Sequence, residues 1–371
     1  MPQALDGIRP ALNSGELAWL ATQEDVESRL VFTQGHGKDT HYEVRHGPFE
    51  NDVLSSLPRQ NWTLLVQDVE KHLPEFRALF AAVDFIPDWR IDDLMVSFAA
   101  PGGSVGPHKD NYDVFLCQGE GVREWHLGDG DKVIEDESSN DLSLVMPFVD
   151  QEPQTAAGGD LFYIPPGVPH WGIAQDFCMT YSIGMRAPSL AELKAGAARL
   201  FDDLDDITAN SSATGADVFY EDPDLTKNEA VPGLISDAAI RRAGNILRES
   251  ISLDRQRIAM ILGSVATDPK AWLAPERVSD DDAKKLISQM DQKSKLCVHG
   301  MARIAFCETG AACMIFANGH ARQVSPGALE LFQNICKIRA LQGAALCADN
   351  QSELLRWMLT SGVFDLPQAP G

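Results

Sequence analysis

Short, strand-like segments fill the first half of the sequence, and this pattern restricts the fold more than any other feature. Runs rich in aromatic and β-branched residues recur between Gly, Pro and Asp at residues 95–99, 113–118, 123–127, 161–164 and 179–183. Many short strands joined by such turns are typical of a sandwich or barrel. One earlier segment, residues 62–82, has apolar residues at roughly helical spacing, so we expect a helix there.

The pattern becomes helical in the middle of the chain. Leu190, Leu193 and Leu200 fall on one helical face. Further helical patterns cover residues 236–251, 281–290 and 326–340. We therefore expect a small helical domain in the middle third, with apolar faces that suit a subunit interface.

The last hundred or so residues combine these helices with short apolar runs. The runs lie at residues 303–307 and 312–317, and the Asn318-Gly319 pair that follows is a strong hairpin signal. Strands with such a turn, next to helices, suggest a winged-helix-like module.

Acidic residues are in excess, and the excess is unevenly placed. Residues 264–371 contain 11 acidic and 11 basic residues, so the rest of the chain holds 43 acidic and 20 basic residues and the whole net charge of -23. Residues 202–229 hold nine carboxylates and one lysine, and we expect a loop or linker there. A field of this sign repels nucleic acid and attracts a basic partner, although acidity also favours solubility.

Length and cysteine content bound the class of protein. A chain of 371 residues exceeds the usual size of a single core, so two or three domains are expected. The sequence contains no basic-then-apolar leader and no run of eighteen apolar residues. Its seven cysteines include no CxxC pair and no zinc-type spacing, which favours free thiols in a reducing compartment. We predict a cytoplasmic protein without membrane contact.

The first motif that carries chemistry is Gly106-Pro107-His108-Lys109-Asp110, directly before the strand at residues 113–118. Residues two apart in an extended chain project to the same side, so His108 and Asp110 can reach one point in space. A single His-x-Asp triplet is common by chance and predicts little by itself.

A second histidine strengthens the first motif. Residues 159–170 read Gly-Asp-Leu-Phe-Tyr-Ile-Pro-Pro-Gly-Val-Pro-His, in which the prolines and glycine force a turn just before His170. Two histidines and one carboxylate on a β scaffold form the facial-triad pattern of non-haem iron(II), which leaves three coordination positions open. Zinc and manganese are also compatible with these ligands.

An arginine on an apolar strand face points to an anionic ligand. Arg123 alternates with Trp125 and Leu127, so the period of two places its guanidinium inward. A buried guanidinium needs an anion, either an internal carboxylate or one from a small molecule. The distal carboxylate of 2-oxoglutarate fits, with the 2-oxo acid end on the metal, and Ser97 is a candidate for an additional hydrogen bond.

These motifs make the chain resemble the JmjC-type ribosomal oxygenases. The resemblance is dense up to residue 190 or so and thinner beyond it. It is carried by residues 24–31, 46–50, 88–94, 106–115, 163–170 and 182–188. The motifs Gly-Pro-His-x-Asp-x-Tyr-Asp-Val-Phe and Ile-Pro-Pro-Gly-x-Pro-His are specific in combination. The acidic run at residues 202–229 is not part of the family pattern.

For the fold, the resemblance implies an α+β chain in three parts. The first is a double-stranded β-helix, or cupin-like jelly roll, in residues 1–190 that forms the catalytic domain. A helical dimerisation segment in residues 191–262 and a winged-helix-like domain in residues 263–371 follow. The protein is then expected to be a homodimer.

For the chemistry, the resemblance implies iron(II) on His108, Asp110 and His170, with 2-oxoglutarate as cosubstrate on Arg123 and Ser97. It implies a dioxygenase of the protein-arginine 3-hydroxylase type that acts on a basic large-subunit ribosomal protein, without direct contact to nucleic acid. An arginine substrate needs carboxylates or aromatic rings near the metal. By position in the sequence, the candidates are Asp93, Tyr112 and Asp113.

Three other functions are compatible with parts of the sequence. A metal-dependent cupin could act on a small molecule without 2-oxoglutarate, but cupins usually have a third histidine where this chain has Asp110. A protein demethylase would use the same iron chemistry. A DNA-binding regulator is disfavoured, because the winged-helix-like region has no net charge and its neighbours are acidic.

Overall fold

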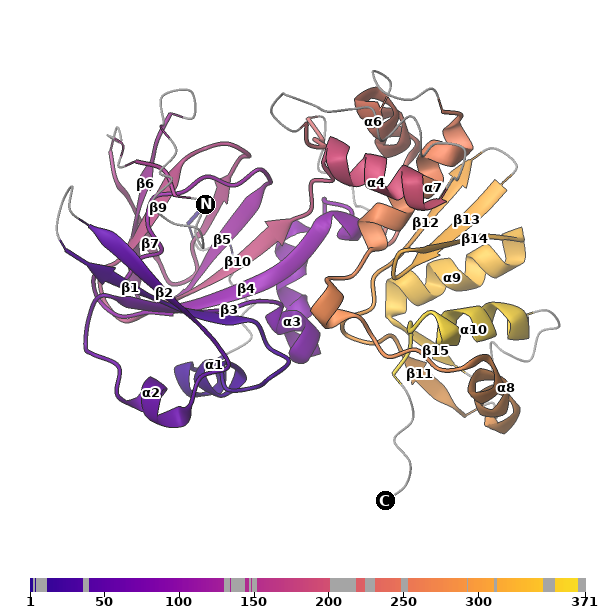
Figure 1. The fold of residues 1–371 in the computed structure, drawn as a ribbon, viewed down its shortest axis with the longest axis horizontal. Coiled ribbons are helices and arrows are strands. Elements are labelled where there is room, and N and C mark those ends of the chain that lie inside the picture. The colour runs from indigo at the N-terminus through magenta and orange to yellow at the C-terminus, as the bar shows by residue number, and fades with distance from the viewer. Residues whose placement is uncertain are drawn as a thin grey trace. The chain divides into compact units, whose positions relative to one another are not determined.

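The computed structural model describes residues 1–2, 4, 12–35, 40–129, 134, 144–146, 148, 152–200, 218–223, 231–247, 253–291, 293–309, 312–342 and 351–365. Its contacts divide the chain into two compact units, residues 1–83 with 91–186 and residues 84–90 with 187–371 (Figure 1). Apart from residues 218–223, the acidic run predicted to be a loop lies outside the described residues. Among the described helices, none combines the length and apolarity that a membrane crossing requires.

Two antiparallel sheets form the first unit, with strand orders β2-β1-β3-β4-β10-β5-β8 and β7-β6-β9 (Figure 1). The strands are β1 Ser28–Gln34, β2 His41–His46, β3 Trp62–Val66, β4 Ile91–Ala99, β5 Val114–Glu120, β6 Val122–Leu127, β7 Gln154–Ala157, β8 Leu161–Ile164, β9 His170–Ala174 and β10 Cys178–Met185. Helices α1 Ser14–Leu20, α2 Asn51–Ser55 and α3 Val69–His72 and the 3-10 helix η2 Pro74–Val83 accompany them. The expected cupin-like β-sandwich is confirmed.

All five strand-like runs of the sequence lie within strands, in β4, β5, β6, β8 and β10. In β6, Arg123 and Trp125 are buried while the residues between and beside them are less so, which is the alternation that a period of two predicts. Strand β10 is buried at every position because it lies in the middle of the large sheet, between β4 and β5.

The predicted helix over residues 62–82 is wrong. Its first part is strand β3, which is buried at every position and pairs with β1 and β4. Asp68, with a left-handed φ of 56°, precedes the short helix α3, and the 3-10 helix η2 follows. A short apolar run that is buried on both faces shows no alternation, so periodicity cannot distinguish it from a helix.

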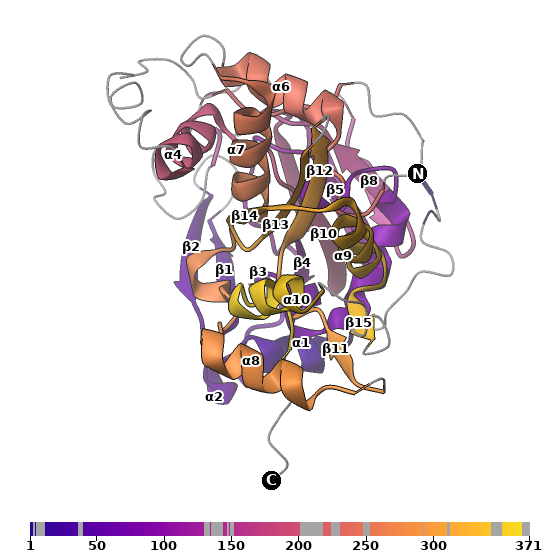
Figure 2. The same cartoon turned by 90° about the vertical axis from the view of Figure 1, so that its right-hand side faces the viewer.

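The second unit contains a three-stranded sheet with a separate core on each face. This sheet consists of β12 Ile304–Thr309, β13 Ala312–Ala317 and β14 His320–Val324. Helices α4 Leu190–Leu200, α6 Asp237–Leu247 and α7 Arg255–Thr267 share one core with Ala305 and Phe316. Helices α8 Asp280–Gln289, α9 Pro326–Ile338 and α10 Gln351–Thr360 share the other with Phe306 and Ile315 (Figure 2).

The remaining elements of this unit are the 3-10 helices η3 Asp88–Arg90 and η6 Ala271–Leu273 and the strand pair β11 Lys295–Cys297 and β15 Ala340–Gln342. The hairpin signal is confirmed, since Asn318 and Gly319 turn β13 into β14 with φ values of 46° and 83°. All six described cysteines are free thiols. The division into a helical segment and a winged-helix-like domain stays a prediction.

Candidate metal and cosubstrate site

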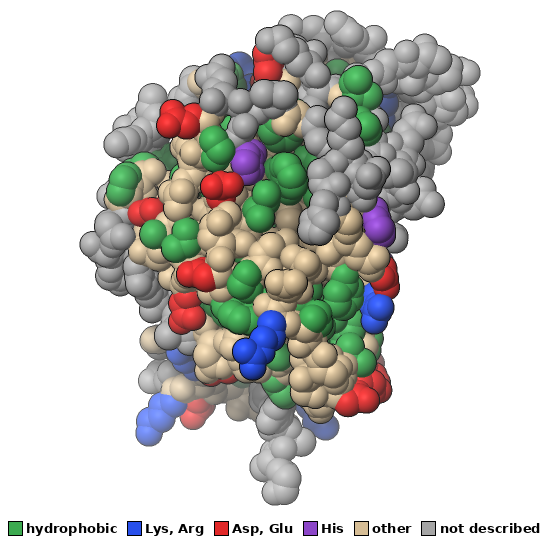
Figure 3. Space-filling view, turned by 90° about the vertical axis from the view of Figure 1, so that its left-hand side faces the viewer, with side chains coloured by type: hydrophobic (Ala, Val, Ile, Leu, Met, Phe, Trp, Pro, Cys, Tyr) green, Lys and Arg blue, Asp and Glu red, His purple; other side chains and the backbone are tan. Residues whose placement is uncertain are grey.

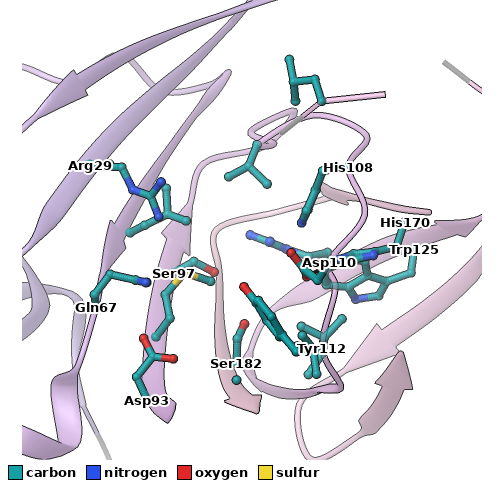
Figure 4. A pocket seen from close by; sticks show the side chains of 18 residues that line it. Arg29, Gln67, Asp93, Ser97, His108, Asp110, Tyr112, Trp125, His170 and Ser182 are labelled. Atoms are coloured by element: carbon teal, nitrogen blue, oxygen red, sulfur yellow. Dashed lines mark ion pairs between the residues drawn. The ribbon is translucent and has the colours of Figure 1, made fainter. Parts of the chain in front are cut away.

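A cavity of about 270 Å³ lies in the first unit. It is lined by all five side chains that the sequence singled out: His108, Asp110, Arg123, His170 and Ser97. They come from β4, β6, the start of β9 and the segment before β5, which are far apart along the chain (Figure 4). The fold therefore brings the predicted residues into one enclosed space.

His108, Asp110 and His170 form the one cluster of metal-donor side chains found among the described residues. One donor atom from each lies within 4.8 Å of the other two. His170 Nε2 is 3.6 Å from Asp110 Oδ2, and the two imidazole rings are 4.2 Å apart between centroids. Two imidazole nitrogens and one carboxylate oxygen at this spacing can converge on a single metal ion.

Main-chain carbonyl groups fix the tautomer of both imidazoles. Nδ1 of His108 lies 2.9 Å from the Gly106 carbonyl oxygen, and Nδ1 of His170 lies 3.0 Å from that of Val168. A carbonyl oxygen only accepts hydrogen bonds, so each Nδ1 carries the proton and donates it. The lone pair of each Nε2 is therefore available to a metal.

The main chain also ties the three residues together. The amide of His108 donates to the carbonyl of His170 at 3.0 Å, and the amide of His170 donates back at 2.8 Å. The amide of Gly167 in the Pro-Pro-Gly turn donates to the Asp110 carbonyl at 2.7 Å. Gly167 has a φ of 75°, which favours glycine at this turn. The positions of the donor side chains are thus set by the backbone.

Burial keeps His170 neutral. Its side chain is 2% exposed, and desolvation, followed by the neighbouring His108, lowers its pKa to about 4, although Asp110 opposes the shift. A metal ion needs the unprotonated imidazole. Near neutral pH, a proton therefore does not compete for this position.

Arg123 is 4% exposed and faces the same cavity. Its guanidinium lies 5.7 Å from the centre of the Trp125 ring, and its Nε and Nη2 have no hydrogen-bond partner among the described residues. Gly172 on β9 makes room for this indole, since a Cβ there would lie 2.6 Å from it. Of the two interpretations of Arg123, an anionic ligand fits the described residues better than an internal carboxylate.

Ser97 lines the cavity from β4 and is 3% exposed. Its hydroxyl oxygen is 3.5 Å from the Thr180 carbonyl oxygen, a distance at the limit of a hydrogen bond. So weak an internal partner leaves the hydroxyl able to turn toward a ligand.

Two of the three candidates for a substrate guanidinium line the cavity. Asp93, 6% exposed, and Tyr112 do so, whereas the Asp113 carboxylate accepts a hydrogen bond from the Tyr163 hydroxyl at 2.7 Å. Burial, followed by the charges of Asp110 and Asp93, raises the pKa of Tyr112 above its ordinary value. Its phenol therefore stays protonated and can donate a hydrogen bond.

The sequence did not point to three other residues of the cavity, Arg29, Gln67 and Leu144. Leu144 is bridged to His108 through the main chain, although 36 positions separate them. Arg29 belongs to one of the segments that carried the resemblance, but its position gave no reason to expect a pocket residue. Only the pairing of β1 with β3 brings it beside the others.

Known proteins share both the sequence and the fold. Residues 78–193 match the family model described as JmjC domain. The ribosomal protein uL16 3-hydroxylase of Escherichia coli (strain K12) is 42% identical over 224 residues, which are 60% of this chain and 54% of that protein. A probable ribosomal oxygenase of Haemophilus influenzae is 34% identical over 239 residues, again 54% of its length. The alignments thus span about half of these curated relatives.

A solved structure covers more of the chain. YcfD, a ribosomal oxygenase from Escherichia coli in complex with cobalt and 2-oxoglutarate, matches 98% of this chain with 93% of its own, at 30% identity and a TM-score of 0.67. A second structure of YcfD, with cobalt and succinic acid, matches at 30% identity and a TM-score of 0.64. Identity and coverage at this level show that the chain belongs to the JmjC ribosomal oxygenase family.

Proposed function

We propose that this protein is an iron(II)- and 2-oxoglutarate-dependent oxygenase that hydroxylates an arginine side chain of the large-subunit ribosomal protein uL16. One observation carries the proposal: three metal-donor side chains and a buried, incompletely partnered guanidinium share one cavity. The relatives support it, because one is named a uL16 3-hydroxylase and another was solved with cobalt and 2-oxoglutarate.

In this proposal, Nε2 of His108, Nε2 of His170 and the Asp110 carboxylate hold iron(II), with the remaining positions open to ligands. Arg123 binds the distal carboxylate of 2-oxoglutarate, and Ser97 adds a hydrogen bond. When bound, the iron and 2-oxoglutarate supply the oxidation, in which O2 gives succinate, carbon dioxide and one oxygen atom inserted into a C–H bond.

Asp93 and Tyr112 are our candidates for binding the substrate guanidinium. Both line the cavity that holds the proposed metal ligands. A carboxylate pairs with a guanidinium through charge-assisted hydrogen bonds, and the rim of a tyrosine ring gives it an aromatic surface. Their role is to orient one carbon of the arginine toward the metal and to exclude water.

The charge of the chain agrees with a basic ribosomal protein as partner. The net charge is -23, which attracts a partner rich in Lys and Arg. Figure 3 shows acidic side chains spread over one face of the first unit, and among the coloured residues of that face the basic ones form no continuous patch. Such a surface favours a basic protein over direct binding of nucleic acid.

For the second unit, we propose a helical dimerisation segment and a winged-helix-like domain in a cytoplasmic homodimer. The β12–β13–β14 hairpins followed by α9 support the winged-helix comparison. Val218 and Val231, about half exposed, offer apolar surface for a partner subunit. Light scattering on the purified protein tests the dimer: a monomeric mass would contradict it.

The direct test is to incubate the protein with iron(II), 2-oxoglutarate, oxygen and purified uL16. We expect succinate and a mass gain of one oxygen atom on uL16, with circular dichroism showing intact folds for all variants. His108→Ala and Asp110→Ala should abolish turnover, because each removes a donor to the metal. Arg45→Ala, an exposed arginine on β2, is the matched control and should retain activity. Full activity in either ligand variant would overturn the site assignment.

The same experiment separates the alternatives. Loss of a methylene mass from a methylated substrate would indicate a demethylase. Turnover of a small molecule without conversion of 2-oxoglutarate would indicate a metal-dependent cupin.

A further inference from the structure

Two polar side chains line the cavity away from the proposed metal ligands. Figure 4 shows Arg29 and Gln67 side by side, on the opposite side from His108 and His170. Arg29 on β1 pairs with Leu65 on β3, and Gln67 follows two positions later, so all three project to the same face. No role proposed above uses Arg29 or Gln67.

Both side chains have a buried atom without a partner. Among the described residues, neither Nε of Arg29 nor Oε1 of Gln67 has a hydrogen bond. Each such atom costs folding about 1–3 kcal/mol. Buried polar groups without partners are rare in proteins, and a ligand is one of the ordinary explanations.

Gln118 shows that the same sheet can satisfy a buried glutamine. Its Nε2 donates to the carbonyls of Glu120 and Met179, at 2.8 and 3.2 Å, and its Oε1 accepts from the Thr180 hydroxyl at 3.0 Å. Gln118 does not line the cavity, whereas Gln67 does. The difference between the two glutamines is thus the presence of a space that a ligand can enter.

The two unpartnered atoms select the chemistry of that ligand. An anion would satisfy Arg29 but would be repelled by the Gln67 oxygen. A cation, such as the target guanidinium, would suit Gln67 but would be repelled by Arg29. A neutral peptide group offers one C=O and one N–H, which match one donor and one acceptor.

We propose that Arg29 and Gln67 bind a main-chain peptide group of the protein substrate next to the residue that is modified. This inference rests on the proposed function, since it takes the substrate to be a polypeptide. Arg29 Nε–H donates to the substrate carbonyl, and Gln67 Oε1 accepts its amide hydrogen. Both are positioning residues, because they hold the substrate chain while the target side chain extends toward the metal ligands.

The test measures binding of fluorescent uL16 peptides that contain the arginine, by anisotropy with manganese(II) and 2-oxoglutarate present and no turnover. Arg29→Ala should weaken binding about tenfold or more, and Gln67→Ala about fivefold, as expected for one charged and one neutral hydrogen bond. Arg29→Lys should restore part of the loss. The control Arg45→Ala should bind as the wild type does, and the affinity for 2-oxoglutarate should be unchanged in every variant.

A backbone N-methyl scan of the peptide identifies the contact. One methylated position should weaken binding to the wild-type protein but not to Gln67→Ala, because that variant has already lost the acceptor. Equal binding by the wild type, Arg29→Ala and Gln67→Ala would overturn the inference. So would an Arg29→Ala defect that disappears when an acidic side chain of the peptide is replaced by alanine, since the ligand would then be an anion.

The outcome is independent of the activity. If the wild type makes succinate but the variants bind normally, this inference fails and the proposed function stands. If the peptide contacts appear but 2-oxoglutarate is never converted, the proposed function fails and the peptide subsite stands. A wild-type protein that binds no uL16 peptide overturns the peptide subsite and the proposed substrate together.

Discussion

Each unit of the molecule buries one arginine almost completely, and the two arginines differ in their partners. Arg90 in the second unit is 1% exposed, and its guanidinium contacts the Asp222 carboxylate and lies 5.0 Å from the centre of the Tyr220 ring. Arg123 in the first unit is 4% exposed and also stacks on an aromatic ring, but its Nε and Nη2 have no partner among the described residues.

Burial alone therefore does not tell a structural arginine from a binding one. Asp222 also accepts hydrogen bonds from Arg242 Nη1 and from the Tyr220 hydroxyl, both at 2.8 Å, so the charges around Arg90 belong to a complete network. The network fastens residues 218–223, the described part of the acidic run, to the core of the second unit. The surroundings of Arg123 are incomplete until an anion arrives.

The largest expected effect tests the complete network. Asp222→Ala leaves Arg90 as a buried charge without its carboxylate, which should lower the free energy of unfolding by about 3–5 kcal/mol. Urea denaturation of the second unit's transition measures it. Arg199→Ala, which breaks an exposed ion pair with Asp268, is the control and should cost about 1 kcal/mol or less. A wild-type midpoint for Asp222→Ala would break the contrast.

The next effect concerns another group of the cavity whose burial is not compensated. The pKa of His170 is about 4, against an ordinary 6.5, so between these values the unfolded chain binds a proton that the folded protein does not. The metal-free protein should therefore lose stability as the pH falls from 6.5 to 4, by about 3 kcal/mol at ~1.36 kcal/mol per pKa unit. Denaturation in EDTA across this range measures it, and His170→Asn should remove most of the slope. An unchanged slope would assign the effect to other groups.

Ligand binding should complete the cavity and stabilise it. With manganese(II) in place of iron, 2-oxoglutarate at a hundred times its Kd should raise the stability of the wild type by about 2.7 kcal/mol. Thermal unfolding with and without 2-oxoglutarate measures the gain. Arg123→Ala should lose most of it, whereas Arg45→Ala should keep it. An equal gain in Arg123→Ala would mean that another group binds the distal carboxylate.

The smallest effect is kinetic. Arg123→Ala should raise the KM for 2-oxoglutarate about tenfold or more, since one charge-assisted contact is lost. Its stability without ligand should stay close to that of the wild type, because no internal carboxylate loses a partner. Steady-state succinate formation gives the KM. A strongly destabilised Arg123→Ala would place Arg123 in the same class as Arg90.

The sequence predicted the site where local geometry decides it. Arg123 was expected to point inward because a strand alternates its faces, and it does. His108 and Asp110 lie two apart in extended chain, and the turn before His170 follows from its prolines and glycine. That all of them line one cavity was expected from the family resemblance, not from their spacing.

Features that depend on distant pairings escaped the sequence. Asp222 lies 132 positions from Arg90, and residues 62–66 form a central strand that periodicity alone read as helix. Arg29 and Gln67 share a face only because β1 pairs with β3. An unpartnered buried atom is a property of the folded state, so no pattern of residue types reveals it.

The paired hydrogen bonds between the backbones of His108 and His170 have a consequence for how the protein is maintained. These bonds do not involve the imidazole Nε2 atoms, so departure of the ion leaves them intact. An emptied or wrongly loaded molecule then recovers by simple exchange of the ion, at the rate at which ligands come and go, with no refolding step. Its service life is set by the chain itself and not by any one iron atom that it carries.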